Sequence, residues 1–265
     1  MAVVLTGDVH HYIPSSDRRH AAESESALAV EYARIAEQHG LKVTLFFTGR
    51  ALRDDATDAR PLLSMASVEI GGHGWDAFRP RWLYRPLARL SGSPHGFRFW
   101  QRRTIARTHA AIERATGAPP KSWRNHAYVH DADTAGLLAE AGIVAWSDHV
   151  DLDRARPYVH ESGLVVLPMN TPPDHENLYH GDRTPESLGD TPSLHPSEWC
   201  ARVLEDAERA LGEGGIATVL AHPLCMKVVD DWRTFDALCS GLSRHRSMFA
   251  TEAAEQSTVG SVPPR

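Results

Sequence analysis

The stretch at residues 2–10 reads AVVLTGDVH, in which an apolar run leads into the carboxylate of Asp8 and the imidazole of His10. Such a run is typical of a strand that is buried on both faces, as in a parallel sheet covered by helices. Side chains two residues apart on an extended chain point to the same side, so Asp8 and His10 are expected to share a face. Functional groups of parallel α/β folds gather where the strands end. This stretch therefore predicts both the fold class and one edge of a site.

The rest of the chain alternates short apolar runs with helical periodicity. The predicted strands are 2–6, 41–47, 68–70, 122–124, 144–146, 164–167 and 216–220, and the predicted helices are 22–39, 97–116, 133–141, 196–211 and 231–242. This β–α alternation predicts an α/β fold, with helices outside a parallel sheet that is either closed as a barrel or open and doubly wound.

The chain is predicted to be a single domain over residues 1–250, because neither an internal repeat nor a Pro/Gly-rich linker divides it. The polar segment 251–265 is predicted to be a disordered tail. Two segments, 79–94 and 169–191, are expected to be irregular loops, and long loops in compact domains are often functional.

The composition limits the classes of partner. The 265 residues carry a net charge of −6 and show no long basic run, so nucleic acid is not an expected partner. No apolar segment is long enough to span a bilayer, and the N-terminal residues do not resemble a signal peptide. The three cysteines, Cys200, Cys225 and Cys239, form no CxxC pair. We therefore expect a cytoplasmic protein.

Ionisable side chains follow six of the predicted strands. They are Asp8 with His10, His73, Arg124 with His126, Asp148 with His149, Asp174 with His175, and His222. Because strand ends converge in this class of fold, we expect these groups to meet in one site. The chain has 16 histidines, and histidine is both the commonest metal ligand and a common acid or base. The pattern indicates a catalytic or metal site.

Six segments resemble, in family order, the motifs of the NodB-like polysaccharide deacetylases, which form carbohydrate esterase family 4. They are VVLTGDVH (3–10), VTLFFTGRAL (43–52), VEIGGHGWDAF (68–78), WRNHAY (123–128), WSDHVD (146–151) and VLAHP (219–223). Motifs in a shared order are a more specific signal than any one of them. The resemblance spans roughly residues 2–245. It implies a distorted (β/α)7 barrel of the NodB-homology type, a divalent metal, and hydrolysis of an N-acetyl amide or a related C–N bond.

By position, the resemblance implies the catalytic groups. Asp8 would be the general base that activates water, and His222 would be the general acid that protonates the leaving amine. Arg124 would pair with a carboxylate, for which Asp148 is the candidate, and would hold Asp8 in place.

The implied metal ligands depart from the family pattern. His10 would replace an acidic ligand, and His73 would be the first histidine of the His-x-x-x-His motif, whose second histidine is Ala77 here. Asp76 lies three residues after His73 and could share its face on a helical turn, as a third ligand. Further candidates are His126 and His175. The implied ion is a divalent metal, with Zn²⁺ as the first choice and Co²⁺, Ni²⁺ or Fe²⁺ as alternatives.

Residues predicted to contact the substrate are Trp75, His126, Asp174 and His175. His126 and Ala127 stand where the family's Arg-x-Pro-Tyr motif has Pro and Tyr, which predicts a reshaped pocket and argues against a chitin-like polymer. We therefore expect deacetylation of an N-acetylated amino sugar or similar substrate, small or carrier-linked. Two alternatives stay open. One is a cyclic amide hydrolase of the allantoinase or imidase kind, and the other is a metal-free barrel that binds a ligand without turnover, which Ala77 suggests.

Overall fold

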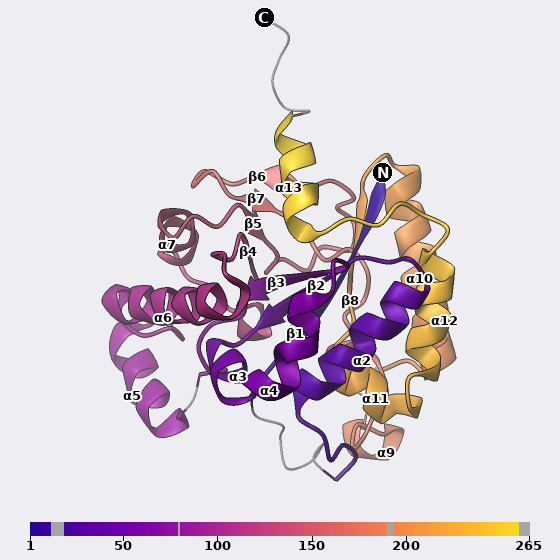
Figure 1. Ribbon diagram of the computed structural model, residues 1–265, viewed down its shortest axis with the longest axis horizontal. Coiled ribbons are helices and arrows are strands. Elements are labelled where there is room, and N and C mark those ends of the chain that lie inside the picture. The colour runs from indigo at the N-terminus through magenta and orange to yellow at the C-terminus, as the bar shows by residue number, and fades with distance from the viewer. Residues whose placement is uncertain (12–18, 79, 190–192, 260–265) are drawn as a thin grey trace, which may run out of the picture.

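A curled eight-stranded sheet forms the centre of the molecule (Figure 1). The computed structural model describes residues 1–11, 19–78, 80–189 and 193–259. The strands are β1 (Ala2–Val9), β2 (Val43–Phe47), β3 (Val68–Gly72), β4 (Ser122–Trp123), β5 (Ala145–Trp146), β6 (Tyr158–Val159), β7 (Val165–Val166) and β8 (Ile216–Leu220). Their order is β6-β7-β5-β4-β3-β2-β1-β8. Each neighbouring pair is parallel except β6 with β7, which is antiparallel.

β1 lies between β2 and β8, and all eight of its residues are buried. Leu5 belongs to the core that β1 shares with helices α2 (Glu25–Gln38) and α10 (Pro196–Gly212), whereas Val4 belongs to a separate core on the opposite face of the sheet. Burial on both faces explains the apolar run that the sequence shows. Parallel strands surrounded by helices confirm the predicted distorted (β/α)7 barrel, to which β6 adds a short antiparallel edge.

The five predicted helices are present, with ends shifted by a few residues. They are α2, α6 (Arg98–Thr116), α7 (Thr134–Glu140), α10 and α12 (Arg233–Leu242). Helices that we did not predict are α3 (Gly49–Asp54), α4 (Ala56–Ala59), α5 (Arg81–Ser91), α8 (Asp174–Asn177), α9 (Pro185–Leu188), α11 (Pro223–Asp230) and α13 (Ala250–Val259). Within the described ranges, no helix is both long and apolar enough to cross a membrane.

The prediction of an irregular loop at 79–94 is wrong, since most of this segment forms α5. Pro86 argues against a helix because proline removes one main-chain hydrogen bond. The helix forms nevertheless because Tyr84 is buried and its ring packs edge-on against Trp100 of α6. In the other expected loop, 169–191, the short helices α8 and α9 interrupt the irregular chain, and positions 190–191 lie outside the described residues.

The prediction of a disordered tail is wrong for residues 251–259, because they belong to α13. Ala253 and Ala254 are buried in the core that contains Val4 and Met248, so this helix covers one face of the sheet. A short segment of small, weakly apolar residues gave little sign of this packing. Residues 260–265 of the expected tail lie outside the described part of the chain.

Asn170 joins the two sides of the barrel, between the chain that follows β7 and the strand β8. Its amide nitrogen donates to the carbonyl oxygens of Ile216 (2.8 Å) and Arg154 (3.0 Å), and its amide oxygen accepts from the backbone N–H of Thr218 (2.9 Å). The side chain is fully buried. It therefore makes hydrogen bonds to β8 of the kind that a neighbouring strand would make.

Replacing Asn170 with alanine should lower the free energy of unfolding by about 2–4 kcal/mol, because buried main-chain groups on both sides lose their partner. Urea denaturation measures the loss. Asn177→Ala is a suitable control, because that amide makes one hydrogen bond, to Pro173, and should cost about 1 kcal/mol. Equal losses in the two variants would show that Asn170 does not close the barrel.

Candidate metal centre and active-site pocket

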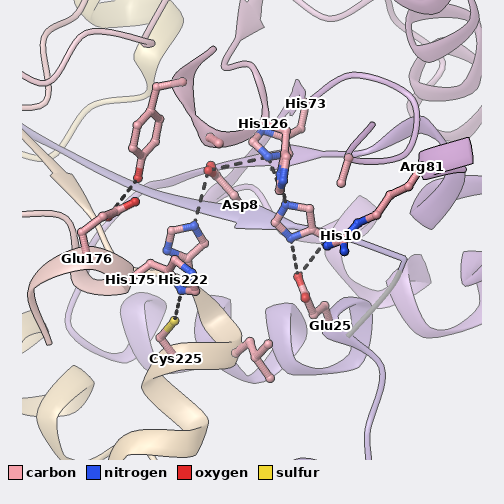
Figure 2. A pocket seen from close by; sticks show the side chains of 14 residues that line it. Asp8, His10, Glu25, His73, Arg81, His126, His175, Glu176, His222 and Cys225 are labelled. Atoms are coloured by element: carbon pink, nitrogen blue, oxygen red, sulfur yellow. Dashed lines mark hydrogen bonds and ion pairs between the residues drawn. The ribbon is translucent and has the colours of Figure 1, made fainter. Parts of the chain in front are cut away.

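A cavity of about 280 Å³ lies where the strands end (Figure 2). Six residues predicted for the site line it: Asp8, His10, His73, His126, His175 and His222. Polar lining residues that we did not predict are Glu25, Arg81, Tyr128, Glu176 and Cys225. The ionisable groups of five strand ends, far apart in the sequence, therefore meet in one pocket.

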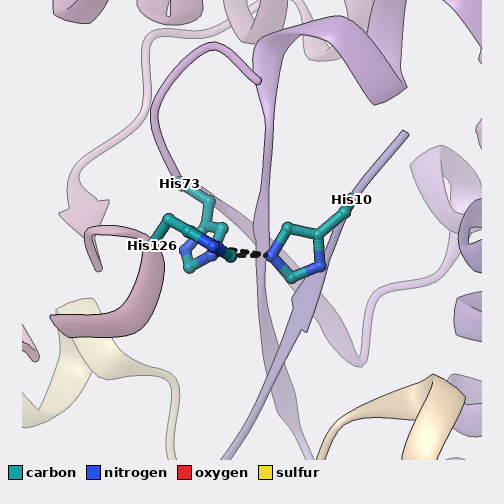
Figure 3. A group of neighbouring side chains, drawn as sticks. All are labelled: His10, His73 and His126. Atoms are coloured by element: carbon teal, nitrogen blue, oxygen red, sulfur yellow. Dashed lines mark hydrogen bonds between the residues drawn. The ribbon is translucent and has the colours of Figure 1, made fainter. Parts of the chain in front are cut away.

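Three imidazole rings converge on one side of this pocket (Figure 3). The Nε2 atom of His10 lies 3.1 Å from Nε2 of His73 and 3.0 Å from Nδ1 of His126. The rings approach edge to face, with the His10 ring centroid 4.9 Å from each of the other two. His126 thus supplies the third nitrogen at a site where Ala77, which also lines the pocket, offers none.

The second ring nitrogen of His73 and of His10 already makes a hydrogen bond to the protein. Nδ1 of His73 lies 2.9 Å from the carbonyl oxygen of Arg124, which can only accept, so this nitrogen carries the proton. Nδ1 of His10 lies 3.0 Å from a carboxylate oxygen of Glu25 and likewise donates. In the tautomer with the ring proton on Nδ1, the Nε2 atoms of His10 and His73 present lone pairs to each other at 3.1 Å.

Facing lone pairs repel unless a cation or a proton lies between them. Burial lowers the pKa of His73 to about 3 and that of His126 to about 2, so these two rings are neutral near pH 7. Neutral imidazoles about 3.3 Å apart are the arrangement that a tetrahedral Zn²⁺ ion requires. The residues present therefore fit a divalent metal.

Glu25 is a site residue that the sequence analysis missed. It begins α2 directly after the N-cap residue Ser24, is 3% exposed, and also accepts the backbone N–H of His10 at 2.7 Å. An acidic residue in the first turn of a helix is expected from the helix dipole alone. Its position therefore gave no sign that it orients a ring 15 residues away.

Asp8 is held by a buried cation. Arg124, fully buried, donates from Nη1 to Asp8 Oδ1 (3.0 Å) and to Thr6 Oγ1 (3.0 Å). Burial alone would raise the pKa of Asp8, but its electrostatic interactions with His73, Arg124 and His222 outweigh this effect and hold the pKa well below the usual value. Arg124 is the cation in direct ion-pair contact with this carboxylate. Asp8 is therefore an ionised carboxylate at neutral pH.

The second carboxylate oxygen of Asp8 lies between two histidines. Oδ2 is 3.8 Å from Nε2 of His73 and 3.5 Å from Nε2 of His222. This oxygen thus lies between the three-histidine cluster and His222, the N-cap residue of α11 at the end of β8. A substrate in the pocket can contact all three groups.

His222 is anchored by Asp174, whose carboxylate accepts from the ring Nδ1 (2.6 Å) and from the backbone N–H (2.6 Å) of His222. Burial disfavours the charged ring, but the Asp174 and Asp8 carboxylates outweigh this effect and hold the pKa of His222 well above its usual value. The prediction that Asp174 contacts substrate is corrected here, because its side chain is fully buried and its oxygens bind His222.

Two further assignments from the sequence do not agree with the contacts. Arg124 pairs with Asp8 rather than with Asp148, which instead accepts from the backbone and side-chain nitrogens of Asn125, at 2.6 Å each. Asp148, predicted as a catalytic group, is buried and lies outside the pocket lining, where it holds the chain at the end of β4.

Asp76 does not join the metal cluster, because it forms an ion pair with Arg50 at 2.6 Å. It lies in a loop in which Gly74 and Ala77 both have positive φ, so the helical turn that we expected to align it with His73 is absent. Trp75 does not line the main pocket either, since Arg107 stacks on its ring at 3.5 Å.

No family model matches the sequence, and no curated protein matches it. Solved structures do match its fold. One, assigned to the polysaccharide deacetylases of Mycobacterium smegmatis, has a TM-score of 0.76 and 20% identity, and the match covers 100% of this chain and 92% of that one. The allantoinase PuuE matches with a TM-score of 0.69 and 12% identity over 100% and 92% of the two chains.

Two more solved structures match the fold. A family 4 acetyl xylan esterase from Clostridium thermocellum, in complex with a cobalt ion, has a TM-score of 0.54 and 17% identity over 99% and 93% of the two chains. A family 4 pseudoenzyme from Bacillus anthracis has a TM-score of 0.55 and 14% identity over 96% and 65%. At these identities the likeness establishes the fold, and the predicted resemblance to carbohydrate esterase family 4 is confirmed at that level.

Proposed function

We propose that this protein is a metal-dependent hydrolase of a C–N amide bond, and that it deacetylates an N-acetylated amino sugar or a similar small or carrier-linked substrate. The proposal is carried by one observation. A ring nitrogen of His10 lies about 3 Å from one of His73 and from one of His126, beside an ionised carboxylate, Asp8, which also faces a protonated histidine, His222. The arrangement provides a cation site, a base and an acid in one pocket.

His10, His73 and His126 would hold the metal, with Zn²⁺ as the first candidate and Co²⁺, Ni²⁺ or Fe²⁺ as alternatives. When bound, such an ion polarises the amide carbonyl and makes water more acidic. Glu25 and the Arg124 carbonyl keep the His10 and His73 rings in the tautomer that presents Nε2 to the ion.

The other groups of the pocket would move the protons. Asp8 Oδ2 takes a proton from water as the water oxygen bonds to the amide carbon, while Arg124 keeps the carboxylate ionised and oriented. His222 then gives its Nε2 proton to the amine nitrogen as the C–N bond breaks, which yields acetate and a free amine. Asp174 stabilises the charged form of His222 until that proton leaves.

The cavity volume of about 280 Å³ favours a small substrate or the end of a larger one. A cyclic amide of the kind that allantoinases open is the second candidate, since the same base and acid would serve its ring C–N bond. A panel of N-acetyl sugars and cyclic amides separates the two. The cytoplasmic location expected from the sequence stays a prediction.

Replacing His126 with alanine should remove about one bound metal ion per chain, because one of the three nitrogen ligands of this cluster is lost. Elemental analysis of protein purified without chelator, then reloaded with Zn²⁺, measures this content. His130→Ala is the matched control, since His130 is exposed and outside the cluster. Unchanged metal content in His126→Ala would exclude His126 as a metal ligand. If reloaded wild-type protein holds no metal and shows no activity, the proposal of a hydrolase is wrong. A barrel that binds a ligand without turnover would then be the better interpretation.

A further inference from the structure

A second group of potential metal ligands borders the pocket, and Figure 2 shows two of them, His175 and Cys225, beside His222. Cys225, in the first turn of α11, places its Sγ atom 3.3 Å from Nε2 of His180 and 3.7 Å from Nδ1 of His175. The two histidines come from the segment 174–180, which follows the segment that Asn170 joins to β8. Three potential ligands from two elements therefore meet at one point.

The distances match those of a tetrahedral zinc site. Zn–S and Zn–N bonds of about 2.3 and 2.1 Å at tetrahedral angles place sulfur and nitrogen about 3.6 Å apart. The two observed separations, 3.3 and 3.7 Å, lie on either side of that value. In addition, Nδ1 of His180 donates to the carbonyl oxygen of Leu178 at 2.8 Å, so its Nε2 atom presents a lone pair toward the thiol.

The burial of the three side chains differs in a way that suits an open site. Cys225 is 3% and His180 6% exposed, whereas His175 is exposed and, together with Cys225, lines the cavity. An ion held here would be anchored from the protein side and would border the pocket at its remaining coordination position. Sites with three protein ligands and one open position are typical of zinc that binds water or substrate.

We propose that Cys225, His175 and His180 form a second metal site, for a borderline-soft divalent ion of the Zn²⁺ class. This site is separate from the three-histidine cluster and does not depend on the proposed hydrolysis. It differs chemically because its sulfur ligand binds as a thiolate, so metal binding releases the thiol proton. In the absence of an ion, Cys225 donates its S–H to His180.

Co²⁺ distinguishes the two sites, because a cobalt–thiolate bond adds a strong near-ultraviolet charge-transfer absorption that imidazole ligands do not. Titrating metal-free protein with Co²⁺ should produce this band in wild type and in His73→Ala, and should not produce it in Cys225→Ser. The zinc content after reloading should fall from about two ions per chain in wild type to about one in either variant.

Two further variants test whether loss of the cobalt band in Cys225→Ser comes from unfolding rather than from loss of the thiolate ligand. His175→Ala changes an exposed side chain and should weaken the cobalt band while the thiol stays present. Cys239→Ser replaces another buried cysteine and should leave the band intact. A wild-type protein that binds Co²⁺ without the band, or a band that persists in Cys225→Ser, would overturn the proposal. Either result would leave the three-histidine site unaffected, so the two proposals fail independently.

Discussion

Replacing Asp8 with asparagine is expected to reduce hydrolysis about 10²- to 10⁴-fold and to lower the free energy of unfolding by about 3–5 kcal/mol. The activity falls because the asparagine side chain cannot take a proton from water. The stability falls because Arg124, which is fully buried, loses the carboxylate that pairs with it among the described residues. Steady-state kinetics and urea denaturation measure the two effects.

The double variant Asp8→Asn/Arg124→Met separates the two roles of Asp8. Removing both charges should restore part of the stability, because no unpaired cation is left in the barrel, while activity stays low. Bound metal should stay near the wild-type content in Asp8→Asn, since Asp8 Oδ2 lies 3.8 Å from His73. Full activity in Asp8→Asn would eliminate this residue as the base.

Much of the barrel could be predicted because its signals are local. The apolar runs of β1 and β2 and the glycine stop after α2 each depend on a few neighbouring residues, and Gly40 does have a positive φ of 70°. The period of two in the first strand also predicted that Asp8 and His10 share a face, and both side chains do line the pocket. Strand-end positions then identified six of the fourteen residues that line the pocket.

The partners of these side chains could not be predicted, because they depend on loop conformations. Asp174 follows a Pro-rich segment that indicates a surface turn. Trp199 of α10 donates its indole N–H to the carbonyl oxygen of Pro172 (3.0 Å), and Asn170 anchors the same segment to β8. These contacts carry Asp174 into the interior, 48 residues away in sequence from His222.

The third metal ligand, beside His10 and His73, could not be predicted either, because its position also depends on loop conformation. A spacing of three residues suggested that Asp76 could join His73, but the chain between them turns through Gly74 with a φ of 74° and does not form a helix. At the next strand end, His126 begins a short turn in which Ala127 has a positive φ of 53°. This turn brings the His126 ring to His10. Backbone conformations of this kind are not visible in the residue types.

Replacing Asp174 with asparagine is expected to lower kcat about 10²-fold or more and to move the alkaline limb of the pH–rate profile to lower pH. His222 must be protonated to act as the acid, and activity is lost as the pH rises through its raised pKa. Burial disfavours the charged ring, and Asp174 is the foremost of the two carboxylates that oppose this effect. Without the charge on Asp174, the ring loses its proton at a lower pH. A profile of kcat against pH measures the shift.

The same ion pair should appear in the pH dependence of stability. His222 has a raised pKa and Asp174 a lowered one, so their mutual stabilisation is complete between the unfolded values of 3.8 and 6.5. It declines as the pH rises through the folded pKa of His222, and also as the pH falls through that of Asp174. Asp206→Asn is a matched control, because Asp206 is a buried carboxylate paired with Arg202 on α10. It should lose stability without moving the pH–rate profile, and an unshifted profile in Asp174→Asn would exclude His222 as the acid that Asp174 supports.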